Sequence, residues 1–580
     1  MAGSAREVVT LQIGHYANFV GTHWWNIQDS SFVYSASEMV YPKEINHDVL
    51  FREGHNLKGE ITYTPRLIAF DLKGSLRMLR QEGELYDIET EEDNIKWAGD
   101  TTLHKVDTGQ KNEFLQDLDK DQDEDIAVTD VSSKDIDTLD TQEAATSDAH
   151  GHVAPPGVDS SGVVKLYDLD TSVEVWTDYL RPHLHPRSIH LVQQYQHHNE
   201  LEPFDVFGFG ESVYRHHSSH TEVEDRLHFF LEECDSLQGL HILVDTYDAF
   251  GGLASAMLEE LADDYVNKGL LVFGVTPASF HNNTMRDNSQ RLLNTLLSYG
   301  GITRHCSAFV PLTLGHPVKT PPVTWPNLQY QADLSYHTSA ILASSLDTVT
   351  LPHRLDGQSC LLSQMTQALT PANRKVVTLQ SSLPLPMTET GSFVDTLMSC
   401  GDQLPWLPLT PMCASQSEMV AQSVVVRGVP PDRLKSAHAS HGRHTAQQSV
   451  LDGYTTTQEV LDQYLQDVCP NTLSASLAVR TPCKVAAPFP HIFSSNINKD
   501  GFLSPKPRPS MSGVETTPMM TSLQSNTAVR HLLDNMCTEV RRQDVAKVFH
   551  RFVDAGLEAD ELSETVESLR TLSEYYDAGR

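Results

Sequence analysis

The chain has 580 residues, which is long enough for two or more domains that each bury their own core. Its 77 acidic and 42 basic residues give a formal net charge of −35, so the phosphates of nucleic acid and the headgroups of anionic lipids would repel it. We therefore predict that nucleic acid is not a partner.

The cysteine pattern and the apolar stretches narrow the class of protein further. The eight cysteines contain no C-x-x-C pair, which favours reduced thiols over a disulfide frame or a zinc site. The first residues carry neither a signal-peptide core nor an Arg- and Ser-rich presequence, so we expect no import signal there. Apolar stretches such as residues 269–275 are much shorter than the ~20 residues that a membrane-spanning helix needs. We expect only peripheral association with membranes.

The N-terminal segment has the pattern of an open α/β sheet. Residues 8–13 predict a strand, Gly14 ends it, and an apolar run that includes Trp24 and Trp25 predicts a helix. We interpret these two tryptophans as core residues. A second strand is predicted at residues 66–71, which places the Asp71 carboxylate at the edge where open sheets bind ligands.

An acidic segment then interrupts this pattern. Residues 113–154 contain many aspartates and few large apolar residues, so they cannot bury enough surface to offset the entropy of ordering. We predict a disordered acidic insertion.

The sheet pattern returns in residues 155–350. A helical pattern is predicted around Ile189, and a buried strand at residues 237–245 precedes Gly251 and Gly252, which open a helix. Another strand at residues 270–275 follows, so this is a βαβ unit and the sheet is predicted to be parallel.

The C-terminal part is predicted to contain a second domain and closing helices. The Ser-, Thr- and Pro-rich region fits an α+β domain with long loops, and the end of the chain carries two amphipathic helices, the first of which includes Phe552. The predicted segments are 1–112 (N-terminal sheet segment), 113–154 (acidic insertion), 155–350 (remainder of the first domain), 351–510 (second domain) and 511–580 (C-terminal helices).

Three separated segments resemble tubulins and occur in the same order as in that family. Residues 6–25 are similar to the tubulin N-terminus, residues 237–258 lie where tubulins carry a glycine-rich signature, and residues 547–562 are similar to the tubulin C-terminal helices. The acidic insertion, the first loop (His-Tyr-Ala-Asn-Phe) and the third (Asp-Thr-Tyr-Asp-Ala-Phe-Gly-Gly) resemble the Misato family specifically.

This resemblance implies both a fold and a role. The fold class is α/β: a tubulin/FtsZ-like parallel-sheet domain of the nucleotide-binding type, then a smaller α+β domain and C-terminal helices. The role implied is non-enzymatic regulation of mitochondrial distribution, morphology and network formation (fusion), in the cytoplasm and at the mitochondrial outer membrane. Implied partners are the outer-membrane or fusion machinery, with tubulin and the cytosolic chaperonin as further candidates.

The resemblance also places a degenerate nucleotide site at Gly14, Asn18, Asp71, Gly251 and Gly252. A phosphate loop needs glycines, because they let successive backbone N–H groups converge on anionic oxygens at a helix N-terminus. The third loop keeps two of five glycines and carries Asp248, whose carboxylate would repel phosphate. We predict no enzymatic activity and no bound cofactor.

Two rival functions remain open at this point. One is a GTP-binding switch of the tubulin type, and the other is a tubulin-folding cofactor that acts with the chaperonin. The crowded histidines, among them His190, His197 and His198, match no zinc spacing, so we interpret them as surface and core residues and predict no metal site.

Overall fold

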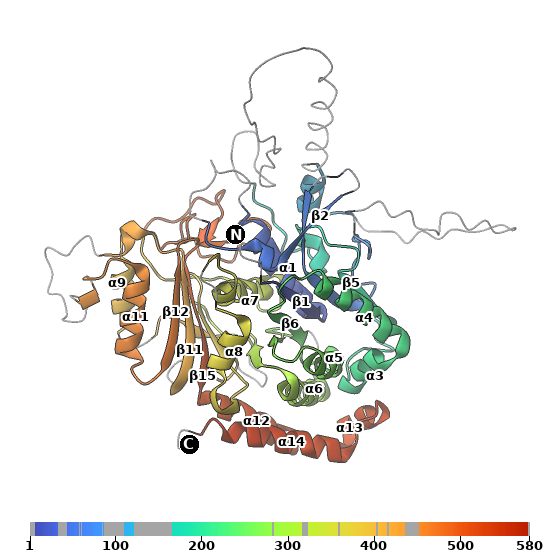
Figure 1. The fold of residues 1–580 in the computed structure, drawn as a ribbon. Coiled ribbons are helices and arrows are strands. Elements are labelled where there is room, and N and C mark those ends of the chain that lie inside the picture. Colours follow the sequence, from blue (N-terminus) through green and yellow to red (C-terminus); the bar gives the residue numbers. More distant parts are fainter. Residues whose placement is uncertain are drawn as a thin grey trace, which may run out of the picture.

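Two sheets organise the molecule in the computed structural model (Figure 1). The structure describes residues 6–32, 43–56, 59, 61–83, 85, 110–120, 165–280, 283–315, 323–357, 360–401, 404–413, 417–435, 450–451, 453–543 and 545–577.

The first sheet has six strands in the order β5-β4-β1-β6-β7-β8, and every neighbouring pair is parallel. The strands are β1 (Val8–Ile13), β4 (Leu67–Lys73), β5 (Ile189–Gln196), β6 (Gly239–Asp245), β7 (Gly269–Val275) and β8 (Ala308–Leu312). Strands β1, β6, β7 and β8 are buried along their whole length, as expected for a parallel sheet with both faces covered. The predicted parallel α/β sheet is confirmed.

Helices cover both faces of this sheet. Along β1, Val8 faces one core and Val9 the opposite one, as the two-residue period of a strand requires. Both tryptophans of the first helix are fully buried, which confirms their predicted place in the core. The helices on the Val8 side are α1 (His15–Asp29) and α7 (Ser335–Val349), and those on the Val9 side are α3 (Phe207–Arg215), α4 (His217–Glu232), α5 (Phe250–Asp264) and α6 (Met285–His305).

The helix predicted around Ile189 is wrong, because this segment is the edge strand β5. Its apolar positions fit a spacing of three as well as one of two. Pairing with β4, which satisfies the backbone of residues 189–192, decides between the two periods.

The second sheet has five strands in the order β10-β9-β15-β11-β12. They are β9 (Thr378–Ser382), β10 (Leu407–Pro408), β11 (Met419–Arg427), β12 (Leu473–Val479) and β15 (Met519–Asn526), and the helices nearby are α8 (Leu362–Leu369), α9 (Phe393–Ser399) and α11 (Thr457–Val468). Strand β15 occupies the middle of this sheet, although the sequence pattern had assigned residues after 510 to the C-terminal helices. The described residues also form two antiparallel strand pairs: β2 (Phe51–His55) with β3 (Ile61–Pro65), and β13 (Cys483–Lys484) with β14 (Thr516–Thr517).

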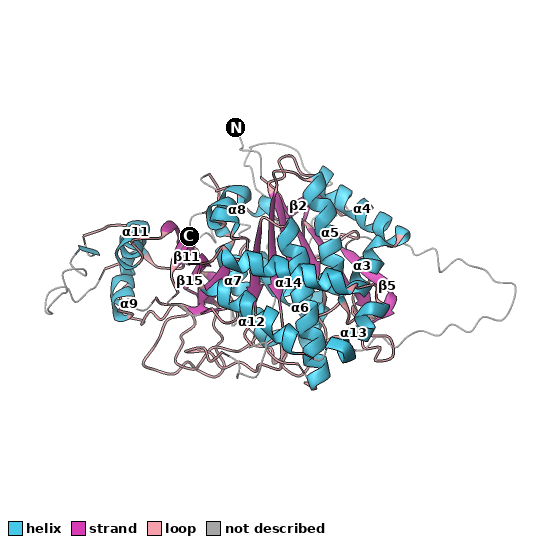
Figure 2. Cartoon of the chain, turned by 90° about the horizontal axis from the view of Figure 1, so that it is seen from below, coloured by secondary structure: helices cyan, strands magenta, loops and turns pink. Residues whose placement is uncertain are grey.

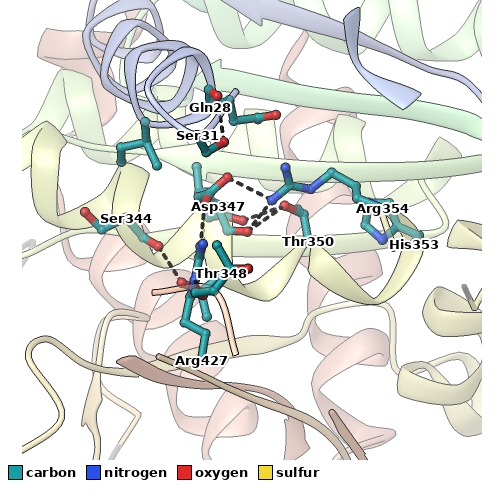
Figure 3. Close-up of polar contacts among 12 residues, drawn as sticks. Gln28, Ser31, Ser344, Asp347, Thr348, Thr350, His353, Arg354 and Arg427 are labelled. Atoms are coloured by element: carbon teal, nitrogen blue, oxygen red, sulfur yellow. Dashed lines mark hydrogen bonds and ion pairs between the residues drawn. The ribbon is translucent and has the colours of Figure 1, made fainter. Parts of the chain in front are cut away.

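Helix α7 lies between the two sheets and every one of its residues except Ser335 is buried (Figure 1). Near its C-terminus, Asp347 accepts hydrogen bonds from two buried arginines (Figure 3). Its Oδ1 lies 2.8 Å from Arg354 Nη2, and its Oδ2 lies 2.5 Å from Arg427 Nη1 on β11. This ion-pair cluster connects the helix shared by both domains to the second sheet.

Three helices close the chain and pack beneath α6, as Figure 2 shows from below. They are α12 (Ala528–Arg542), α13 (Val545–Asp554) and α14 (Ala559–Glu574), one more than the sequence pattern predicted. Phe552 is fully buried, and the Arg551 guanidinium forms two 2.7 Å bonds with the Asp205 carboxylate. The C-terminal helices are therefore docked on the rest of the protein.

Two sequence-based expectations concern segments that are only partly described. Residues 113–120, at the start of the predicted disordered insertion, are helical, and Phe114 is buried against Tyr167. This aromatic contact buries part of residues 113–120, which the acidic composition of the segment did not predict. Residues 121–154 lie outside the described part of the chain. Within the described residues, no helix is both long and apolar enough to cross a bilayer.

Candidate functional site

The carboxyl edge of the first sheet brings together three of the five predicted site residues, Gly14, Asn18 and Asp71. Ile13 pairs with Phe70 on one side and with Val244 on the other, so Gly14 lies between Asp71 and Asp245. Gly14 has a φ of +123°, which favours glycine, and a Cβ there would lie 2.4 Å from Asp245 Oδ2. The glycine therefore lets the Asp245 carboxylate approach the start of α1.

Asp245 occupies the anion-binding position of that helix. Its Oδ2 accepts the Tyr16 backbone N–H at 2.9 Å, and its Oδ1 accepts the Ala17 N–H at 2.8 Å. These donors have no partner within the helix, and the helix dipole adds a partial positive charge there. The carboxylate thus satisfies the groups that would otherwise bind a phosphate. Burial raises the pKa of Asp245, and the two backbone hydrogen bonds oppose that rise.

Asp71 accepts hydrogen bonds from three side chains, which fix the orientation of its carboxylate. Its Oδ2 accepts hydrogen bonds from Trp176 Nε1 at 2.8 Å, His15 Nδ1 at 3.0 Å and Asn18 Nδ2 at 3.2 Å. Burial alone would raise the pKa of Asp71, but the charge of His15 and their hydrogen bond outweigh it and hold this pKa below its usual value. Burial likewise opposes ionisation of His15, whose pKa is nevertheless raised by Asp71. Each side chain therefore stabilises the charged form of the other.

The side chain of Asn18, which was predicted to contact a nucleotide, also forms its hydrogen bonds within the protein. Its Nδ2 donates to the Phe70 carbonyl at 2.9 Å as well as to Asp71. The adjacent Phe19, at the position where tubulins commonly contact guanine, is buried between His15 and Tyr179.

Gly251 and Gly252 lie in the first turn of α5 and serve the packing of helices. A Cβ at Gly251 would lie 1.9 Å from Ser298 Oγ on α6, and one at Gly252 would lie 1.9 Å from the Phe207 carbonyl at the start of α3. Asp248 Oδ1 accepts the Phe250 N–H at 2.9 Å, so a carboxyl group also bonds to the first N–H of this helix. Burial and the charge of Asp245 raise the pKa of Asp248 well above its usual value.

Sequence reasoning missed the residues that complete this edge. Asp245 was visible as the last residue of a predicted strand, and the parallel pairing of that strand with β1 could have placed its carboxylate beside Gly14. His15, Trp176 and His197 carried no such signal, because their contacts with Asp71 or with one another join segments far apart in the sequence. The edge carries the acidic side chains Asp71, Asp245 and Asp248, whose oxygens suit a cation better than a phosphate.

Comparison with known proteins supports the same fold. Residues 6–120 match the Misato Segment II tubulin-like domain, and residues 168–355 match a tubulin domain. The chain is 39% identical over 585 residues to protein misato homolog 1 of Homo sapiens, covering 100% of this chain and 99% of that protein. It is 39% identical to the Danio rerio homolog over 99% of this chain and 98% of that protein, and 30% identical to protein misato of Drosophila melanogaster over 98% of each. The chain therefore belongs to the Misato family of tubulin-like proteins.

Proposed function

We propose that this protein is a non-enzymatic, tubulin-like regulator of mitochondrial distribution, morphology and network formation. It acts in the cytosol and at the mitochondrial outer surface, through the outer-membrane or fusion machinery. Membership of the Misato family supports the role, and the occupied edge of the first sheet supports its non-enzymatic character. Attachment to the membrane is peripheral and passes through a protein partner, because a chain with a net charge of −35 is repelled by anionic lipid headgroups.

The observation that carries the non-enzymatic assignment is the position of Asp245. A bound phosphate would need the Tyr16 and Ala17 N–H groups that this carboxylate already uses. It would also lie at the sheet edge that carries the ionised Asp71 carboxylate, at a cost in electrostatic repulsion. Tubulin-type phosphate binding at this edge therefore requires displacing a side chain that the fold holds in place.

The first test measures nucleotide chemistry on the purified full chain. Binding of labelled GTP and release of phosphate are followed over a range of protein concentrations, with purified tubulin as the positive control. We expect no turnover above background and at most weak binding. Turnover that rises with protein concentration and is abolished by Asp71→Ala would instead favour the GTP-binding switch.

The second test measures the role in cells. We expect depletion of the protein to alter the mitochondrial network, and re-expression of either the wild-type chain or Lys73→Ala to restore it. Lys73 is an exposed cation at the end of β4 and the candidate phosphate contact of the switch hypothesis, so a switch should lose activity with this substitution. A fall in soluble tubulin that precedes any change in mitochondria would favour the folding-cofactor alternative.

A further inference from the structure

Three side chains that could bind a metal ion converge at the carboxyl edge of the first sheet. His15 begins α1, Asp71 lies near the end of β4, and His197 follows β5. Each offers one ligand atom, and these atoms all lie within 4.8 Å of one another. The group was invisible to spacing rules because it combines three segments that are distant in the sequence.

The carboxylate of this group is already oriented. Trp176 Nε1 and Asn18 Nδ2 donate to Asp71 Oδ2, and the Leu72 N–H donates to its Oδ1 at 2.8 Å. Hydrogen bonds of this kind fix the direction of metal-binding carboxylates and tune their basicity. Asp71 thus has the outer support that a metal ligand needs.

His197 supplies the observation that points to a missing ligand. Its Nε2 is buried and has no hydrogen-bond partner among the described residues. The ring packs on His15 with 4.2 Å between ring centroids, and the His197 backbone N–H is bonded to the Lys73 carbonyl. A buried polar nitrogen without a partner is costly, and an ion bound there would satisfy it.

The electrostatics of the edge favour a cation. A neutral His197 ring offers the lone pair of its unpartnered Nε2 to such an ion. The ionised Asp71 carboxylate supplies negative charge to the group, and 24% of the His15 side chain is exposed, which leaves a path from solvent.

We propose that His15, Asp71 and His197 bind one divalent transition-metal ion, with Zn²⁺ the best match to two imidazoles and one carboxylate. Zinc ligands about 2.0–2.1 Å from the ion lie roughly 3.0–3.4 Å apart, and His15 Nδ1 and Asp71 Oδ2 are separated by 3.0 Å. Binding displaces the His15 Nδ1 proton into solvent and draws the His197 ring toward the pair. A fourth position stays open to water.

Such an ion would cross-link α1, β4 and the turn after β5, at the sheet edge where tubulin relatives bind nucleotide. The inference does not depend on the proposed mitochondrial role, since it rests on the ligand geometry alone. It replaces the sequence-based prediction of no metal site.

The test uses the full chain, stripped of metal with a chelator and then titrated with ZnCl₂ or CoCl₂. Calorimetry gives the stoichiometry and affinity, and X-ray absorption at the zinc edge identifies the ligand atoms. The decisive variant is His197→Phe, which keeps the ring packed on His15 but removes the ligand. Its matched control is His550→Phe, because His550 Nδ1 lies 2.8 Å from Asp554 in an exposed pair without a second histidine.

We expect one ion per chain, bound at least tenfold more tightly by the wild type and His550→Phe than by His197→Phe. The zinc spectrum should show nitrogen and oxygen neighbours with imidazole scattering and no sulfur. Added zinc should raise the melting temperature of the first two proteins only. If His197→Phe fails to fold, His15→Gln replaces it. Equal affinity in all variants, sulfur ligands or no binding would overturn the proposal and leave His15 and Asp71 as a structural ion pair.

Discussion

At the residue scale, one carboxylate determines what the carboxyl edge of the first sheet can bind. A helix N-terminus attracts any anion because its first N–H groups are unpaired and its dipole is positive there. In this protein the anion is Asp245, which is covalently part of the fold and so competes with phosphate at a high effective concentration.

Removing that carboxylate should therefore create an anion site. In Asp245→Ala the Tyr16 and Ala17 N–H groups lose their acceptor, which should lower the melting temperature. Phosphate or sulfate added to the buffer should then restore part of the loss in this variant, beyond the general effect of salt on the wild type. Thermal unfolding with and without sulfate, against chloride at equal ionic strength, measures the difference. An equal response of both proteins would mean that Asp245 does not fill an anion site.

A second residue-scale prediction concerns the dependence of stability on pH. Burial lowers the pKa of His23 to about 3, whereas an unfolded histidine titrates near 6.5. Between these values the unfolded chain binds the extra proton, so stability falls as pH falls, by about 1.4 kcal/mol per pH unit for this residue. His23→Gln keeps a donor for the Tyr336 carbonyl and should make the slope shallower by that amount. Urea unfolding between about pH 7 and pH 5 provides the comparison, and an unchanged slope would contradict the assignment.

At the element scale, the glycines that suggested a phosphate loop bring helices into close contact. Helix α5 approaches α3 and α6 so closely that a methyl group at Gly251 or Gly252 has no room. A motif that keeps its glycines can therefore retain the packing of a family after the ligand function is altered. Sequence alone cannot separate the two uses, because both select the residue without a Cβ.

Alanine substitutions at Gly251 and Gly252 should have different effects, because the added methyl groups would clash with different atoms. Glycine to alanine inside a helix normally stabilises by about 1 kcal/mol, but here both changes should destabilise. Gly251→Ala meets the Ser298 side chain, so adding Ser298→Gly should recover part of the loss. Gly252→Ala meets the Phe207 backbone carbonyl, so the same second change should not help. Melting temperatures of the four variants decide the matter; stabilisation by either single change would show that the contacts are loose.

The last helices give another prediction at this scale. Phe552 is fully buried on α13, whereas its neighbour Val553 is 50% exposed. Phe552→Asp places a charge in an apolar contact and should cost several kcal/mol and reduce soluble yield. Val553→Asp, the matched control, should keep close to wild-type stability. Equal effects would mean that α13 is not docked as described.

The elements that the sequence predicted correctly are those whose pattern lies within a few neighbouring residues. Strands β1, β6 and β7 were readable because each is a short apolar run next to a glycine or polar residue. The stripe that includes Phe552 was readable because its apolar residues follow the helical period. Strand β5 was misjudged because its spacing fits two periods, and β15 because its central position depends on pairing with β9 and β11, which lie far earlier in the sequence. The contacts of His15, Asp71 and His197 needed the folded chain for the same reason.

At the scale of the whole molecule, α7 makes the two domains interdependent. The helix packs on α1 and also contacts β11 and β15, so neither sheet keeps its full core without it. The cluster of Asp347, Arg354 and Arg427 is buried at this junction, and the Arg427 guanidinium also donates to the Thr481 and Pro482 carbonyls. We therefore expect both sheets to unfold together.

The Asp347 carboxylate is the residue on which that coupling is best tested. Burial would raise the pKa of Asp347, but the two arginines outweigh it and keep the carboxyl group ionised. Asp347→Ala leaves two buried guanidinium groups without their counter-ion, which should cost about 3–5 kcal/mol. Glu539→Ala, which breaks an exposed pair with Arg542, should cost less than about 1 kcal/mol. Replacing all three charged residues of the cluster by Leu or Met should recover stability relative to Asp347→Ala, since no buried charge is then left alone.

Hydrogen exchange in urea should show β1 and β11 losing protection together in the wild type and in Asp347→Ala, at a lower urea concentration in the variant. Loss of protection in β11 alone would mean that the second sheet unfolds independently and that α7 does not couple the domains.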